Sequence, residues 1–248
     1  MLVHRFHAPG FTDDRGVALP DDEAQHLARV LRLRPGDTIA IFDGKGREAV
    51  AQIETIRGRT VIVRAVAPRQ PVEEPKLPLT LAQALLKSDG MDRVIRDAVM
   101  LGVTAVQPFV SRRTDVPPTA LRSGVRRQRW ERTAISSIKQ CGRAVVPPVL
   151  NPIAFSKLVS MSEGRTVLMF VEPSALQPGV VRDLRSLEGT TPQDAMVVIG
   201  PEGGWDPDEV TAAAGAGVTP VTFRGATLRA DAAGAAAIAL LRYVWADT

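Results

Sequence analysis

A glycine-rich loop between a strand and a helix constrains this chain more than any other stretch of its sequence. The apolar run Met196–Ile199 predicts a buried strand, and Gly-Pro-Glu-Gly-Gly follows it at positions 200–204. A helix is expected next, because Asp206 suits an N-cap and Pro207 the first helical position, with Glu209 three residues after the cap. In open α/β sheets, ligands bind where such loops leave the carboxyl ends of strands.

This loop differs from the common phosphate-binding loops. It contains neither a Gly-x-Gly-x-x-Gly pattern nor a Lys-Ser/Thr ending. Its glycines at positions 200, 203 and 204 instead allow backbone to come close to a ligand or to another chain segment. The loop therefore predicts a ligand site without identifying the ligand.

Composition excludes several classes of protein. With 248 residues, 45% of them apolar and 23% charged, the chain is expected to form one large or two ordinary globular domains. The longest apolar run, Ala232–Leu241, is too short to span a bilayer, and no signal segment is expected at the N-terminus. Cys141 is the single cysteine, which excludes an internal disulfide and a cysteine-based zinc site. We expect a cytoplasmic protein with no membrane segment and no metal.

Histidines are confined to the start of the chain. His4, His7 and His26 are the only three, so a histidine-based triad in the C-terminal part would need its base from the N-terminal part. This distribution favours chemistry done by positioning and electrostatics over hydrolysis.

Positive charge is concentrated in one stretch. The net charge is +4, and between Val110 and Val145 the only acids are Asp115 and Glu131. The basic residues of that stretch are Arg112, Arg113, Arg122, Arg126, Arg127, Arg129, Arg132, Lys139 and Arg143. Because so few acids stand nearby, a phosphate backbone is favoured as partner over a solvated, salt-bridged helix face.

A proline-rich segment divides the chain. Residues 1–70 are predicted to form a small β-rich domain, residues 71–78 a linker and residues 79–248 a second domain. The first domain is expected to contain strands at Val3–His7, Thr38–Phe42, Arg47–Ile56 and Thr60–Ala67, a helix from Asp22 to about Leu33 capped by Asp21, and a hairpin turn at Asp43–Gly44.

Strands and helices alternate after the linker. Strands are predicted at Leu79–Leu85, Val103–Val110, Val167–Val171, Met196–Ile199 and Val218–Phe223, and helices at Met91–Leu101, Gly124–Gln140 and Ala232–Trp245. This alternation predicts an α/β fold with a largely parallel sheet and helices on both faces.

Four motifs in this order resemble one family. They are Lys87–Asp92 with Leu101–Val103 and Pro108–Thr114; Arg129–Trp130 with Gln140–Arg143 and Pro147; Gly200–Gly204; and Thr227–Asp231. The set is similar to the RsmE family of bacterial 16S ribosomal RNA uridine N3-methyltransferases, which belong to the SPOUT superfamily. The stretches His26–Leu33 and Pro35–Asp37 are similar to that family's PUA-like RNA-binding domain.

The resemblance implies a fold, a cofactor and partners. It implies a small N-terminal PUA-like β-barrel domain and a SPOUT-type parallel sheet with a deep C-terminal trefoil knot. It further implies that S-adenosyl-L-methionine is the methyl donor, that 16S rRNA in the assembled 30S ribosomal subunit is the substrate, and that the protein is a homodimer. The implied cofactor-binding residues are Val171, Glu172, Pro173, Gly200, Pro201, Glu202, Gly203, Gly204, Gly225, Thr227, Leu228 and Arg229.

Catalytic and RNA-binding residues are expected among the polar members of these motifs. Arg229 is a candidate cation for the uracil oxygens, with a structural cap or dimer salt bridge as the alternative. Asp231 is either the base or a helix cap, and Gln140 either touches the target nucleotide or a phosphate. Candidate RNA contacts are Arg112, Arg113, Arg126, Arg129 and Arg143, the last with a structural alternative.

Two other functions stay open, and three departures from the family pattern keep the second of them open. Met100 and Lys139 stand where the family usually has Glu, and Ala230–Asp231 where it commonly has Thr-Glu. One alternative is a SPOUT methyltransferase of another RNA position. The other is a non-enzymatic ribosome-assembly factor that binds RNA.

Overall fold

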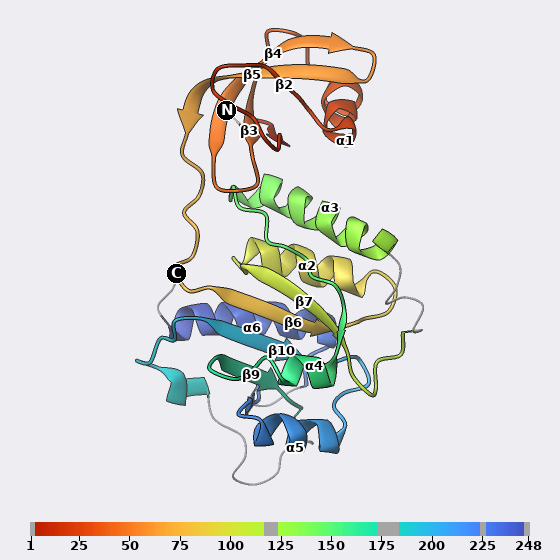
Figure 1. The fold of residues 1–248 in the computed structure, drawn as a ribbon, viewed down its shortest axis with the longest axis vertical. Coiled ribbons are helices and arrows are strands. Elements are labelled where there is room, and N and C mark those ends of the chain that lie inside the picture. The colour runs from red at the N-terminus through yellow and green to blue at the C-terminus, as the bar shows by residue number, and fades with distance from the viewer. Residues whose placement is uncertain (1–2, 117–123, 173–183, 224–226, 246–248) are drawn as a thin grey trace. The chain divides into compact units, whose positions relative to one another are not determined.

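The computed structural model describes residues 3–116, 124–172, 184–223 and 227–245 (Figure 1). The chain packs into two compact units. The first comprises Met1–Glu74 and Ile135–Val146, and the second Pro75–Ala134 and Pro147–Thr248. The predicted division at the proline-rich segment did not anticipate that residues 135–146 group with the first unit. In the described residues, no helix has the length and apolarity needed to cross a bilayer.

The first unit contains a five-stranded sheet in the order β1-β3-β4-β5-β2. Its elements are β1 (Arg5–His7), β2 (Val17–Ala18), α1 (Asp21–Gln25), a π-helical turn η1 (His26–Val30), β3 (Thr38–Phe42), β4 (Glu48–Arg57) and β5 (Thr60–Arg69). Strands β1 and β3 are parallel and the other pairs antiparallel. The four expected strands are confirmed, Thr38–Phe42 with the predicted ends and the other three with ends within two residues of those predicted. The two-residue β2 carries too little pattern to be foreseen.

The expected helix of this unit differs from the observed one. Asp21 is its first residue rather than its cap, and Pro20 occupies the cap position without a side-chain hydrogen bond. The helix then widens into η1, whose C-cap is Leu31, and Arg32 adopts a left-handed φ of 55°. The helix therefore stops earlier than predicted, before the Pro35–Gly36 signal is reached.

A single arginine organises the interior of the first unit. Arg5 pairs with the buried Glu48 at 2.7 Å. The same guanidinium donates to backbone carbonyls of residues 138, 139, 142 and 143, which end or follow the last turn of α3 (Gly124–Cys141). A helix leaves its last carbonyls without backbone donors, and Arg5 supplies them.

The second unit contains a six-stranded sheet in the order β11-β9-β10-β6-β7-β8, and every strand pair is parallel. Its strands are β6 (Leu79–Ala84), β7 (Ala105–Val110), β8 (Ile153–Ala154), β9 (Thr166–Phe170), β10 (Ala195–Ile199) and β11 (Thr219–Val221). Its helices are α2 (Gly90–Met100), the first part of α3, α4 (Phe155–Val159), the 3₁₀ turn η4 (Leu184–Leu187), α5 (Pro207–Gly215) and α6 (Ala230–Val244).

Helices cover both faces of this sheet, so the predicted α/β fold is confirmed. Helices α4 and α5 pack on one face, in a core that includes Ala82, Val198 and Trp205. Helix α6 packs on the opposite face, where Gly234 lies directly over Leu81. The predicted trefoil knot concerns the C-terminal part of the chain, where residues 173–183 and 224–226 lie outside the described residues, so the knot stays a prediction.

Candidate active site

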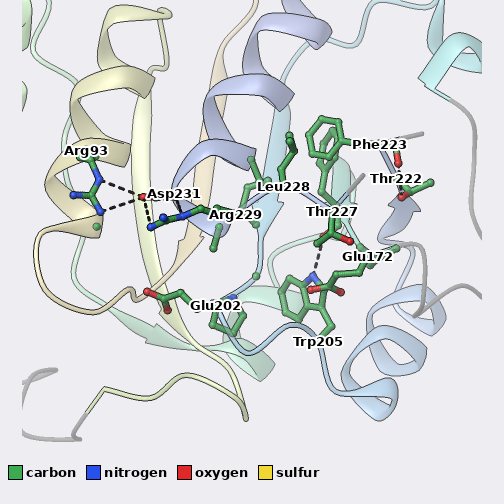
Figure 2. A pocket seen from close by; sticks show the side chains of 18 of the residues that line it. Arg93, Glu172, Glu202, Trp205, Thr222, Phe223, Thr227, Leu228, Arg229 and Asp231 are labelled. Carbon is green, nitrogen blue, oxygen red and sulfur yellow. Dashed lines mark hydrogen bonds and ion pairs between the residues drawn. The ribbon is translucent and has the colours of Figure 1, made fainter. Parts of the chain in front are cut away.

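A cavity of about 460 Å³ opens in the second unit at the carboxyl ends of β9 and β10 (Figure 2). Phe170 and Ile199, the last residues of these strands, line it. Residues after β11 and the start of α6 close one side, and the connection between β6 and α2 closes another. Four segments far apart in the sequence thus form one cavity, at the sheet edge where parallel α/β folds bind ligands.

Most of the predicted cofactor residues line this cavity. They are Val171, Glu172, Gly200, Pro201, Glu202, Thr227, Leu228 and Arg229. Gly203 and Gly204 do not line it. Pro173 and Gly225 lie outside the described residues. The cavity also contains residues that the motifs did not single out for the cofactor, including Arg93, Thr222 and Phe223.

The glycines of the 200–204 loop make room for other parts of the chain. A Cβ on Gly203 would lie 3.0 Å from the carbonyl oxygen of Arg113. Gly204 has a φ of +72°, and a Cβ there would lie 2.8 Å from Glu172 Oε1. A Cβ on Gly200 would lie 2.9 Å from the Trp205 ring. Of the two purposes expected for these glycines, close approach to another chain segment is therefore the one observed.

Hydrogen bonds hold this loop against the sheet. The buried Gln83 donates through Nε2 to the carbonyl of Gly200 at 3.3 Å. Glu202 accepts from the backbone N–H of Lys87 at 3.1 Å, which fits an anchoring role. Trp205 donates through Nε1 to the carbonyl of Phe170 at 2.8 Å. Sequence reasoning missed Gln83, although a polar side chain inside the apolar run Leu79–Leu85 is a signal for a buried hydrogen bond.

Arg112 and Arg113 follow β7 and contact the elements around the loop. Arg112 pairs with Asp206 at 2.9 Å and with Asp208 at 2.8 Å. Arg113 donates through Nη1 to the carbonyl of Gly203 at 3.4 Å. Both side chains therefore brace the cavity loop and the start of α5, and their predicted contact with RNA stays a prediction.

The start of α5 confirms the expected cap. Asp206 is the N-cap, and its carboxylate accepts from the N–H of Asp208 at 3.1 Å. Glu209, three residues after the cap, does not close a capping box, because its Oε1 accepts from the backbone N–H of Arg112 at 2.9 Å. The carboxylate of Glu209 is buried and joins α5 to the end of β7.

Asp231 lies between two arginines at one end of the cavity (Figure 2). It pairs with Arg93 at 3.1 Å and with Arg229 at 3.2 Å. Arg229 is the N-cap residue of α6 and no side chain caps that helix, so the expectation that Asp231 caps it is wrong. The carboxylate hydrogen bond raises the pKa of Arg93 above its ordinary value, which keeps this guanidinium charged.

Gln140 and Arg143 belong to the first unit and do not line the cavity. Gln140 is exposed. Arg143 is only 3% exposed and pairs with Glu74 at 2.5 Å, an arrangement that matches its structural alternative rather than an RNA contact at the surface. Two other candidate RNA contacts, Arg126 and Arg129, are exposed on the first half of α3, where Arg129 also pairs with Asp92.

One of the three departures from the family pattern lies in the cavity. Ala230 lines it. Met100 is exposed at the end of α2. Lys139 pairs with Glu23 at 2.8 Å inside the first unit, where burial raises the pKa of the Glu23 carboxyl despite this partner. The described geometry thus gives Met100 and Lys139 no part in the cavity.

Comparisons with known proteins agree with this geometry. Residues 73–242 match the model of the RNA methyltransferase domain, and residues 19–66 match that of the RNA methyltransferase PUA domain. A ribosomal RNA small subunit methyltransferase E from Synechocystis is 32% identical over 94% of this chain and 74% of its own length. A relative of the same name from Mycobacterium bovis is 30% identical over 96% and 90%.

Solved structures show the same fold. A ribosomal RNA small subunit methyltransferase E from Neisseria gonorrhoeae, bound to S-adenosyl methionine, matches with a TM-score of 0.85 and 33% identity over 98% of both chains. A methyltransferase from Legionella pneumophila in complex with the same cofactor matches with a TM-score of 0.88 and 25% identity over 98% of both chains. The parallel sheet, the cavity at its carboxyl edge and these matches together show that the chain belongs to the ribosomal RNA small subunit methyltransferase E family.

Proposed function

We propose that this protein transfers a methyl group from S-adenosylmethionine to N3 of a uridine in 16S rRNA of the small ribosomal subunit. The observation that carries the proposal is the cavity at the carboxyl ends of β9 and β10, built from the segments that the motifs had singled out. Family membership supports ribosomal RNA as the substrate and S-adenosylmethionine as the methyl donor.

The residues of the cavity fit this cofactor. A volume of about 460 Å³ lies within the usual range for small-molecule sites. Phe170, Phe223 and Leu228 offer apolar cover of the kind that an adenine ring needs. The carboxylate of Glu172 suits ribose hydroxyls or a cationic group.

When bound, the cofactor supplies an activated methyl group whose bond to sulfur breaks as its bond to N3 forms. The protein has to orient the uracil, let N3 lose its proton and stabilise the negative charge that spreads to the uracil oxygens. Arg229 suits the last task, because it lines the cavity and its side chain is 82% exposed. Both oxygens of Asp231 already accept from guanidinium groups, which leaves Asp231 poorly placed as the base.

Basic residues outside the cavity are proposed to hold the RNA. Arg126 and Arg129 lie exposed on α3, and phosphate groups are the natural partners of such side chains. A PUA domain in the first unit supports a second RNA contact made through phosphates and shape. We retain Gln140, exposed at the end of α3, as a candidate contact to the target nucleotide.

Three further properties belong to this proposal. We propose that the protein is a homodimer, supported by the exposed apolar side chains of Leu240 and Tyr243 on α6. We propose a knotted C-terminal segment, supported by the match to solved methyltransferase structures over nearly the whole chain. We place the protein in the cytoplasm, because its proposed substrate is made there.

Methyl transfer from labelled S-adenosylmethionine tests the function directly. Small subunits and naked 16S rRNA that lack the modification serve as substrates, and the product nucleoside is identified by mass. We expect N3-methyluridine at a single site. A different methylated nucleoside would mean another specificity, and RNA binding without any transfer would support the assembly-factor alternative.

A further inference from the structure

Arg93 lines the cavity, yet neither the motifs nor the comparisons give it a role. It lies in the first turn of α2, and its guanidinium reaches across to α6 (Figure 2). Its Nε and Nη2 donate to Asp231 Oδ2 at 3.3 and 3.1 Å. Its Nη1 donates to Asp89 Oδ2 at 2.8 Å. Arg93 is thus fixed between a carboxylate of its own helix start and a carboxylate of another helix.

Asp231 is in turn fixed on both sides. Arg229 donates to it through Nε at 3.2 Å and through Nη2 at 3.3 Å. One carboxylate, whose side chain is 17% exposed, therefore accepts four hydrogen bonds from two guanidinium groups. In the described part of the chain, Asp231 is the ion-pair partner of the largely exposed Arg229.

This arrangement addresses a physical problem of the proposed site. An exposed arginine samples many rotamers, and holding it in one of them before substrate arrives lowers the entropic cost of using it. Asp231 can hold the Arg229 side chain in one rotamer only if the Asp231 carboxylate is itself held in one orientation. Arg93 removes that freedom, because it binds Asp231 from a second helix that packs against α6.

We propose that Arg93 is a positioning residue for methyl transfer, which acts through Asp231 to hold the Arg229 guanidinium in the orientation that meets the target uracil. The proposal rests on the function proposed above. It predicts that Arg93 matters to the rate only as long as Arg229 is present.

A double-mutant cycle tests this dependence. Single-turnover methyl transfer to small subunits is measured for R93M, R229M and the double variant, with the dissociation constant of S-adenosylmethionine measured by calorimetry. We expect R93M to lower the rate about tenfold, since small misplacements of a reacting group have effects of that order or more. The KM for small subunits and the cofactor dissociation constant should stay within about twofold. The double variant should be no slower than R229M.

Two matched variants complete the cycle. R96M changes an arginine of the same helix that pairs with Asp97 and does not line the cavity, and it should transfer methyl at the wild-type rate. R93K keeps the charge but loses the planar guanidinium that can bind a carboxylate through two nitrogens. Its rate of methyl transfer should lie between those of wild type and R93M. Effects of R93M and R229M that multiply would overturn the proposal. So would a tenfold weaker cofactor affinity in R93M, which would make Arg93 a cofactor ligand.

A measurement without turnover separates this proposal from the proposed function. The ¹⁵N order parameter of the Arg229 Nε–H reports how firmly its side chain is held. It should fall in R93M and stay unchanged in R96M. If it falls while the wild-type protein methylates nothing, the proposed function fails and the positioning contact stands. If it does not change in R93M, the positioning proposal is wrong whatever the protein methylates.

Discussion

The two units use arginine–carboxylate pairs in opposite ways. In the first unit, Arg5 and Glu48 pair with side chains that are 8% and 1% exposed, and Arg69 pairs with the same carboxylate at 2.8 Å. In the second unit, Arg229 pairs with Asp231 at the edge of a cavity and remains largely exposed. A buried pair holds a fold together, whereas a half-exposed pair presents a charge to something that arrives from outside.

Burial explains the difference. A buried ion pair loses its hydration, so removing one partner leaves a charge with neither water nor counter-ion. An exposed pair loses little hydration and contributes little to stability, which leaves its charge available for a ligand. We therefore expect substitutions in the first unit to change stability and substitutions around the cavity to change activity.

The largest effect is expected from Arg5→Met. It leaves the buried Glu48 with the partly exposed Arg69 as its partner and removes the donor to four carbonyls of residues 138–143, so it should lower the free energy of unfolding by about 3 kcal/mol. Urea unfolding measures this. Arg47→Met is the matched control, because Arg47 pairs with Asp13 at the surface of the same unit and should cost at most about 1 kcal/mol. Equal losses in both variants would contradict the contrast between buried and exposed ion pairs.

Arg229→Met should reverse that pattern. Losing the cation proposed to stabilise the uracil oxygens should lower the rate of methyl transfer on the order of 10²-fold. The midpoint of urea unfolding should hardly move, because the Arg229 side chain is exposed. Single-turnover assays and urea unfolding on the same preparation measure both. A variant that unfolds earlier but transfers methyl normally would assign Arg229 to the fold instead.

Gly204→Ala should have an intermediate effect. Its φ of +72° is costly for alanine by about 1–2 kcal/mol, and the new Cβ would lie 2.8 Å from Glu172 Oε1, so the carboxylate of Glu172, proposed to contact the cofactor, has to move. We expect roughly tenfold weaker binding of S-adenosylmethionine, measured by calorimetry. Gly217→Ala is the control: it also has a positive φ of +87°, yet no atom lies within 4 Å of its Cβ position, so affinity should be unchanged. Equal affinities in the two variants would rule out the steric argument.

The smallest expected effect is a pH dependence of stability that is confined to the first unit. Burial lowers the pKa of His7 below its ordinary value of 6.5, although a backbone hydrogen bond with Asp43 and the negative charges of Asp22 and Asp43 act in the opposite direction. The folded state therefore binds a proton less readily than the unfolded state. The stability that this contributes is fully present above pH 6.5 and is lost as pH falls from there through the folded pKa.

In the His7→Gln variant, the stability of the first unit should decrease less as the pH falls below 6.5. Amide hydrogen exchange, followed separately in the two units, measures it. Burial lowers the pKa of His26 as well, so some dependence should remain in the single variant. All three histidines lie in Met1–Glu74, so the second unit should show no matching change in this window. A pH response of equal size in the second unit would mean that carboxylates, not histidines, cause it.

Much of the fold was predictable because its signals are local. Apolar runs such as Leu79–Leu85 and Met196–Ile199 marked buried parallel strands, and Asp206–Pro207 marked the start of α5. The predicted cofactor segments also came together, because parallel strands bring their carboxyl ends to one edge of the sheet. The π-helical turn His26–Val30 was missed, since its sequence reads as ordinary helix.

The individual contacts of the site were less predictable. Nothing near Glu209 in the sequence indicates that its carboxylate accepts from Arg112 instead of closing a capping box, because the two lie 97 positions apart. Arg143 stands in a basic stripe, yet it is buried against Glu74. A charge pattern gives the residues of a stripe but not which of them turn inward.

The sequence by itself determined the strands, the glycine-rich loop at the carboxyl end of β10 and the family resemblance, because each depends on residues that are neighbours along the chain. Only the tertiary structure decided which charges meet. Arg93 and Asp231 are 138 positions apart and pair because α2 and α6 pack together, beside a sheet whose strand order is not the order of the chain. Local propensity acts over a few residues, whereas an ion pair between distant residues exists only once the packing of whole elements has placed them within reach.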